Sequence, residues 1–93
     1  MIESFRHKGL KALYEDDNTS GVKQDQVKRL RSLLAKLDAS SNPADMDLAG
    51  LKLHPLQGNF AGFHAVMVSG NWRLIFRFDA AGSAIDVDLI DYH

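Results

Sequence analysis

The chain has 93 residues, 45% of them hydrophobic and 25% charged, and a net charge of −1. This length accommodates one domain around one modest core, since domains usually need on the order of 100 residues each. The absence of cysteine excludes a disulfide framework, a thiolate zinc site and a cysteine nucleophile. No apolar run approaches the roughly 18 residues that span a bilayer, and residues 1–8 lack the apolar stretch of a signal peptide. We therefore expect a single domain, residues 1–93, that is cytoplasmic and has no membrane partner.

The charge is unevenly distributed along the chain. Residues 1–36 hold eight basic and five acidic residues, a net +3, and residues 37–93 hold three basic and seven acidic residues, a net −4. A basic segment of this kind either binds a polyanion or forms a solvated helix face. Three of its cations fall in the second predicted helix: Lys28, Arg29 and Arg31.

The first predicted helix covers residues 8–15, where Leu10 begins an apolar pattern at i, i+3 and i+4. Its start has two interpretations. Ser4 is a suitable N-cap for it, and residues 1–5 alternatively form a short strand.

The second predicted helix follows a polar break at residues 16–21 and has Ser20 as its expected N-cap. Its leucine-rich face continues to about Ala39, and the short connection to the first helix predicts an αα-hairpin. Pro43 then indicates a capped turn with proline at the first helical position.

The apolar period becomes two residues in the last third of the chain. Residues 63–69 and 72–78 flank Gly70-Asn71, a two-residue hairpin signal, and residues 84–90 form a further predicted strand. Helices followed by an antiparallel meander predict an α+β fold, with two N-terminal helices packed on one face of a small antiparallel sheet.

The two-residue turn predicts a register in which Ser69 lies opposite Trp72, Val68 opposite Arg73 and Phe63 opposite Phe78. The face expected under the helices is wholly apolar and comprises Phe63, Ala65, Met67, Leu74, Phe76 and Phe78. The face expected to stay open comprises His64, Val66, Val68, Arg73, Ile75 and Arg77.

The open face is the candidate site. Arg73 and Arg77 project from it about 13 Å apart along one strand. Guanidinium groups there either bind phosphate bidentately or pair with Asp86 and Asp88 on the neighbouring strand. His64 either orients Arg77 or caps the rim of the sheet.

Ordinary catalytic signatures are missing from the sequence. It has no G-x-S-x-G, P-loop or G-x-G-x-x-G motif, and its four histidines match no zinc-ligand spacing. What remains is histidine, tyrosine, aspartate and arginine chemistry without a metal or other cofactor. This set suits RNA phosphodiester cleavage, because the RNA 2′-hydroxyl is itself the nucleophile. The protein then supplies a general base, a general acid and cations for the charge on phosphate.

Four segments in order resemble the HigB branch of the RelE/ParE toxin superfamily: IESFRHKGL at 2–10, LHPLxG at 53–58, VSGNWRLIFRF at 68–78 and DVDLIDYH at 86–93. The resemblance implies the RelE-like fold with a first strand near residues 2–5 and a type II toxin, monomeric outside its complex with a HigA-like helix-turn-helix antitoxin. It also implies metal-independent cleavage of mRNA in the ribosomal A site.

The resemblance also assigns site residues. The expected catalytic residues are His54, Arg73, Asp91, Tyr92 and His93. One histidine of that set would be the general base and the other the general acid, with Asp91 orienting a histidine. Tyr92 would stack on or hydrogen-bond the substrate, and Arg73 would bind the scissile phosphate. The expected substrate-binding residues are Lys52 and Arg77, with Lys28, Arg29 and Arg31 binding ribosomal RNA.

Gln57 departs from the family pattern, since HigB relatives often have lysine at this position. The absence of that cation supports an alternative function, a non-catalytic module with a degenerate toxin fold that only binds RNA or its antitoxin. The superfamily also contains gyrase poisons of the ParE type, but the histidine-rich ending favours the nuclease branch.

Overall fold

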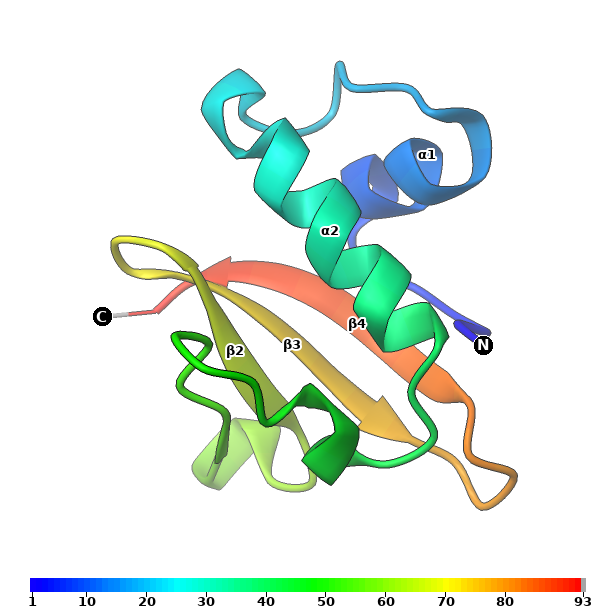
Figure 1. Cartoon of the computed structure of the whole chain (residues 1–93), viewed down its shortest axis with the longest axis vertical. Helices are drawn as coiled ribbons and strands as arrows, with labels where there is room; N and C mark the ends of the chain where they lie inside the picture. Colours follow the sequence, from blue (N-terminus) through cyan, green and yellow to red (C-terminus); the bar gives the residue numbers. More distant parts are fainter. Residues whose placement is uncertain (93) are drawn as a thin grey trace.

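The computed structural model describes residues 1–92 and confirms the predicted α+β class (Figure 1). The helices are α1 (Lys8–Asp16) and α2 (Val27–Asp38), with short 3-10 turns η1 (Gln24–Gln26), η2 (Pro43–Met46) and η3 (Gly58–Phe60). The strands are β1 (His54–Pro55), β2 (His64–Ser69), β3 (Trp72–Phe78) and β4 (Ala84–Asp91). They form one antiparallel sheet in the order β1-β2-β3-β4. Within the described residues, no helix has the length and apolar character needed to cross a membrane.

Helix α1 is capped by His7, so the expectation of Ser4 as its N-cap is wrong. The His7 Nδ1 accepts a hydrogen bond from the Leu10 N–H at 3.1 Å. Residues 2–5 run extended beside β4 and form two isolated parallel bridges with it, which supports the strand interpretation. Ser4 is part of that extended segment, and its hydroxyl accepts from the Asp86 N–H.

Helix α2 begins at Val27, later than the expected N-cap Ser20. The loop after Ser20 packs against α1 instead of starting a helix, because Gly21 and Gly9 approach so closely that a Cβ on Gly9 would overlap the Gly21 carbonyl. The turn η1 then leads into α2, which ends one residue before the predicted boundary at Ala39. The leucine face is buried as expected.

The predicted hairpin register holds only at the turn. Ser69 lies opposite Trp72, but a bulge at Val68 then shifts β2, so that Met67 lies opposite Arg73 and His64 opposite Phe76. The face assignment made for β2 is therefore wrong, because a shift of one residue moves every side chain to the other face. The assignment made for β3 is correct.

The main core lies between the helices and the sheet. It joins the leucines of both helices to Leu74 and Phe76 of β3, as predicted, and to Val66 and Val68 of β2, which replace the expected Ala65 and Met67. The bulge suits this packing because it lets both valines point toward the helices.

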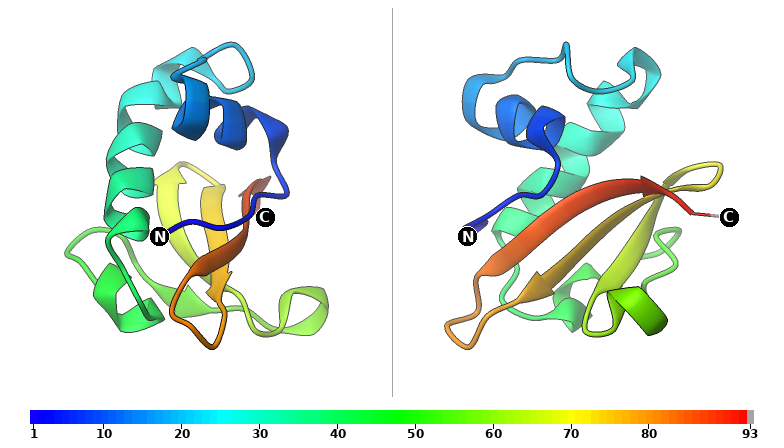
Figure 2. Two further views of the ribbon diagram at one scale, coloured as in Figure 1. Left: turned by 90° about the vertical axis from the view of Figure 1, so that its right-hand side faces the viewer. Right: turned by 180° about the vertical axis from the view of Figure 1, so that it is seen from behind.

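A second apolar cluster covers the sheet face that was expected to stay open. Its buried members are Leu56, Phe63, Ala65 and Ile75, with Phe60 and Ile90 packed against them. Figure 2 (left) shows α2 on one side of the sheet and the η3 segment on the other. Apolar residues on both faces explain why periodicity alone could not choose the register of β2.

Candidate functional site

Three predicted site residues lie on the sheet face opposite the helices. His54 pairs with Ala65, and Arg73 pairs with Ile90, so each shares a face with a member of the second cluster. Tyr92 follows Ile90 by two residues, and strand alternation directs it to the same side. The second cluster therefore forms the floor beside these three polar side chains.

His54 is oriented by the backbone of Lys52. Its Nδ1 lies 3.0 Å from the Lys52 carbonyl oxygen, which can only accept a hydrogen bond, so Nδ1 carries the proton of that bond. In the neutral ring the lone pair then lies on Nε2, which is the atom able to accept a proton from substrate. Lys52 adopts φ of 53°, a left-handed conformation that costs a non-glycine residue about 1–2 kcal/mol. This strain accompanies the turn that brings the carbonyl to the ring.

Tyr92 stands beside His54 across the sheet. The two ring centroids are 6.5 Å apart with an interplanar angle of 56°. The Tyr92 N–H donates to the Asn71 carbonyl at 2.8 Å, and Figures 1 and 2 show the end of β4 next to the β2–β3 turn. The side chain is 48% exposed, so it offers an accessible aromatic surface on which a nucleobase can stack.

Arg73 is held by the same turn. Its Nη1 donates to the Gly70 carbonyl at 2.7 Å and to the Trp72 carbonyl at 3.1 Å. These bonds use one nitrogen of the guanidinium group, and Nη2 and Nε have no partner among the described residues. Within residues 1–92, Arg73 forms no ion pair with Asp86 or Asp88. Its remaining donors have the fork geometry that suits a phosphate.

Asp91 and His93 complete the predicted set in different ways. Asp91 is the last residue of β4 and pairs with Trp72, a residue packed against the helix-side core. Strand alternation directs Asp91 away from the face that carries Tyr92. His93 lies outside the described residues.

Arg77 pairs with an aspartate on the neighbouring strand, as one of the two interpretations of the sequence predicted. Its Nε donates to the Asp86 carboxylate at 2.8 Å, at a bulge where Asp86 has φ of 54°. It lies four residues beyond Arg73 on β3, with its guanidinium carbon 5.7 Å from the centre of the Phe63 ring. The structure thus places Arg77 at the other end of the open face from Arg73. The imidazole of His64 takes no part in this, and its buried Nδ1 has no partner among the described residues.

Three cations of α2 lie on the helix layer and differ in their contacts: Lys28, Arg29 and Arg31, the α2 cations. Arg31 forms an ion pair with Asp17 at 2.7 Å, and Arg29 donates to the Met67 carbonyl at 3.3 Å. All three cations are exposed. Lys28 makes no contact of this kind within residues 1–92, so the set retains positive charge at the surface.

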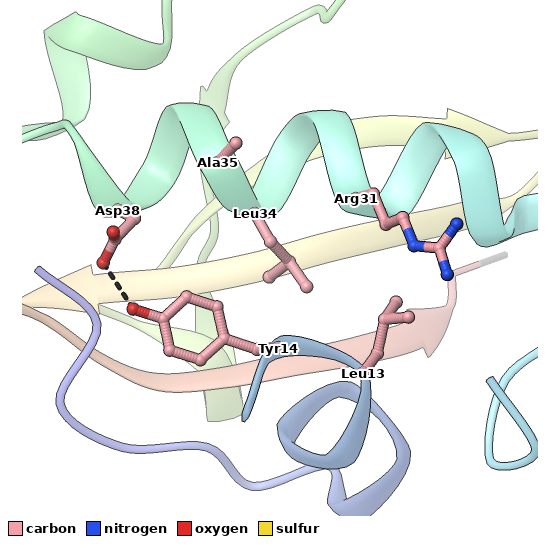
Figure 3. Close-up of a pocket in the computed structure, with 6 residues that line it drawn as sticks. All are labelled: Leu13, Tyr14, Arg31, Leu34, Ala35 and Asp38. Atoms are coloured by element: carbon pink, nitrogen blue, oxygen red, sulfur yellow. Dashed lines mark hydrogen bonds between the residues drawn. The ribbon is translucent and has the colours of Figure 1, made fainter. Parts of the chain in front are cut away.

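A groove between the two helices has a volume of about 260 Å³ (Figure 3). The Tyr14 hydroxyl donates to Asp38 at 2.6 Å across it, and Asp38 also accepts from the Ile2 N–H. The hydrogen bond to Asp38, with burial second, raises the pKa of Tyr14 to about 12. The same bond lowers the pKa of Asp38. The groove is lined by residues of α1 and α2, on the layer opposite His54.

Sequence reasoning missed the role of the turn backbone. The carbonyls of Gly70 and Asn71 hold Arg73 and Tyr92, yet no residue pattern identifies which carbonyl a distant side chain will contact. It also missed Gln26, which is 2% exposed although it looks like an ordinary polar helix residue. In residues 1–92 no group of three metal-ligating side chains occurs.

Comparison with known proteins decides the family. Residues 3–93 match the family described as RelE-like toxin of type II toxin-antitoxin system HigB. The chain belongs to the HigB-like toxin family. It is 40% identical to Endoribonuclease HigB of Proteus vulgaris over 93 residues, covering the full length of both chains. Its fold is similar to that of YafQ from E. coli strain BL21(DE3), with a TM-score of 0.53 and 22% identity over 95% of this chain and 87% of YafQ.

The match confirms the resemblance drawn from the four sequence segments, together with the toxin and type II toxin–antitoxin assignments. A type II toxin has an antitoxin partner. The roles of individual site residues remain predictions.

Proposed function

We propose that this HigB-like toxin is a ribosome-dependent mRNA endoribonuclease that inhibits translation. The observation that carries the proposal is the grouping of His54, Tyr92 and Arg73 on one accessible face, each held by a backbone contact. Such a grouping supplies a proton acceptor, a stacking surface and a phosphate-binding fork. The full-length similarity to Endoribonuclease HigB of Proteus vulgaris supports the same activity.

The proposed reaction uses the RNA 2′-hydroxyl as nucleophile. His54 Nε2 accepts its proton while the 2′-oxygen attacks the adjacent phosphorus. The P–O5′ bond breaks, and the leaving 5′-oxygen takes a proton from the general acid, for which His93 is the candidate. The products are a 2′,3′-cyclic phosphate and a 5′-hydroxyl end. The reverse assignment, with His93 as base and His54 as acid, fits the same balance.

Arg73 would stabilise the charge that develops on the phosphate. Its two carbonyl contacts fix the guanidinium before substrate arrives, so little reorganisation is needed in the transition state. The exposed Tyr92 ring would hold a base next to the scissile bond. Asp91, which is directed away from His54, would orient His93, and Lys52 would add positive charge at the rim. No metal enters this scheme.

The proposed partners follow from the same scheme. The α2 cations would bind ribosomal RNA, and Arg77 would contact the mRNA backbone further along the open face. A HigA-like helix-turn-helix antitoxin would neutralise the toxin, which would be a monomer outside that complex and act in the cytoplasm. Gln57 is exposed beside β1 and brings no charge, so the site would rely on Arg73 for its main phosphate contact.

The test is cleavage of a defined mRNA on purified ribosomes, with the same RNA free in solution as comparison. The proposal expects cleavage only on ribosomes, with 2′,3′-cyclic phosphate ends. His54→Ala should reduce the rate by a factor of ~100 or more, since a proton-transfer group typically contributes that much. Activity restored only by zinc or manganese after chelation would contradict the metal-free scheme. Folded wild-type protein that binds ribosomes without cutting would support the non-catalytic alternative.

A further inference from the structure

Gln26 is a buried polar residue, and its burial does not follow from fold stability alone. It is the last residue of η1, and its side chain is almost completely covered. Its Nε2 lies 3.0 Å from the Ser69 hydroxyl, while Oε1 is buried without a partner among the described residues. Exchanging the two ends of the amide would still leave one end unpaired, and a buried unpaired polar group costs free energy. An apolar side chain of similar length, such as methionine, would fill this space without that cost.

Ser69, the partner of Gln26, sits where the β2–β3 hairpin leaves its regular ladder. The bulge at Val68 precedes it, and Gly70-Asn71 follow it as the turn. A bulged strand end next to a two-residue turn is only weakly fixed by its own backbone hydrogen bonds. The bond from Gln26 therefore ties this end of the hairpin to the start of α2.

The β2–β3 turn holds two side chains of the candidate site. The carbonyl of Gly70 accepts from Arg73, and the carbonyl of Asn71 accepts from the Tyr92 N–H. A movement of the turn would move both side chains relative to His54, which belongs to a different strand and takes its orientation from Lys52. Gln26 thus connects through Ser69 to two of the three described site residues.

Two neighbouring side chains reinforce this connection. Arg29 donates to the Met67 carbonyl just before the bulge, and the Lys23 ammonium lies 5.7 Å from the centre of the Trp72 ring just after the turn. Both contacts are exposed, so they are weaker constraints than the buried Gln26 amide. Residues 23–29, which lead into α2, therefore contact the hairpin on both sides of the turn.

We propose that Gln26 is a positioning residue for RNA cleavage, which through Ser69 fixes the β2–β3 turn and thereby the places of Arg73 and Tyr92. The inference rests on the proposed endoribonuclease function. It implies that the buried amide is kept for geometry in the site, since displacements near 1 Å of a catalytic group can reduce a rate ~100-fold.

The test replaces Gln26 by methionine and measures stability and catalysis separately. Gln26→Met should unfold at an unchanged or higher denaturant concentration, because an unpaired buried polar group is removed. Its single-turnover cleavage rate on saturating ribosomes should fall by about 10-fold or more, with an unchanged half-saturating ribosome concentration. Ser69→Ala should lower the cleavage rate by a similar factor, and Ser69→Thr should keep the wild-type rate. The double variant Gln26→Met, Ser69→Ala should lower the rate no more than either single change.

Ser40→Ala is the matched control. Ser40 is the other buried polar residue in the described chain, and its hydroxyl bonds only to the Lys36 carbonyl within α2. Ser40→Ala should lower stability and leave the saturating rate unchanged. A wild-type rate in Gln26→Met would overturn the proposal. So would a rate loss that follows the denaturation midpoint across all variants.

Amide hydrogen exchange of Tyr92 gives a readout that needs no catalysis. Gln26→Met should speed exchange of this N–H by about 10-fold or more, since its bond to Asn71 depends on the turn. If wild-type protein cuts no mRNA and Tyr92 exchange still rises in the variant, the proposed function fails and the positioning holds. Unchanged Tyr92 exchange would overturn the positioning whatever the activity.

Discussion

Replacing Arg73 by alanine separates a catalytic arginine from a structural one. The side chain makes two hydrogen bonds to turn carbonyls and no ion pair among residues 1–92. Losing two partly exposed hydrogen bonds costs ~1 kcal/mol, near the lower end of measured values per bond. A domain of this size has roughly 5 kcal/mol of stability or more, so Arg73→Ala should remain folded.

The expected loss of cleavage is much larger. Removing one preorganised charge contact to a transition state costs about 2.7–4 kcal/mol, which is a factor of ~100 to 1,000 in rate. Arg73→Lys keeps the charge, but a single ammonium cannot donate to Gly70, Trp72 and a phosphate in fork geometry. This variant should therefore fall between alanine and wild type.

The assay is single-turnover cleavage of a programmed mRNA on saturating ribosomes, with urea unfolding of each variant measured alongside. Lys11→Ala removes an exposed cation from α1 and controls for net charge. Equal saturating rates for Arg73→Ala and wild type, with both folded, would remove Arg73 from the site. A loss of stability of several kcal/mol with little change in rate would assign it a purely structural role.

Three further results are expected. Reversing all the α2 cations to glutamate should weaken ribosome co-sedimentation and flatten its salt dependence, because each lost phosphate contact reduces that slope; unchanged binding would mark a solvated face. Gln57→Lys should raise the cleavage rate at limiting ribosome concentration, and an equal or lower rate would show that no phosphate passes this position. Tyr14→Phe should lower the free energy of unfolding by ~1 kcal/mol or less between about pH 5 and 9. This difference should shrink in acid, where Asp38 with its lowered pKa becomes protonated. It should also shrink in alkali, as the pH rises from the ordinary tyrosine pKa of 10.0 toward the raised pKa of Tyr14, about 12. A difference in unfolding free energy that stays constant from about pH 2 to 12 would refute the Tyr14–Asp38 bond.

The helices and β3 were predictable because each has one dominant apolar face. The leucines of α2 and the Leu74/Phe76 pair of β3 leave a single way to bury them. In β3, the buried Ile75 of the second face is flanked by Arg73 and Arg77. Strand β2 lacks such charged markers, and Val66 and Ala65 are both fully buried on opposite sides of the sheet. The bulge at Val68 depends on which residue fits under the helices, and such packing is a tertiary property that period-two alternation does not contain.

The site was predictable as a set of residue types and only partly as a geometry. Resemblance to a toxin family gave His54, Tyr92 and Arg73, and the structure brings them to one face. Four backbone carbonyls hold them there, those of Lys52, Gly70, Asn71 and Trp72, and carbonyls carry no sequence signal. Arg77 was grouped with Arg73 because four residues on a strand share a face, but the Asp86 bulge offered it a nearer partner.

Under the proposed function, the two layers of the molecule would contact different parts of a ribosome-bound RNA. The α2 cations lie on the helix layer, whereas His54, Tyr92 and Arg73 face away from it across the sheet. Arg29 donates to the carbonyl of Met67, the residue opposite Arg73, so the two surfaces approach each other near the β2–β3 turn. A ribosomal site surrounds its ligand and can present RNA to both layers together. In the proposed scheme, charge on the helix layer would contribute binding affinity, and the open face would be left to the mRNA that is cut.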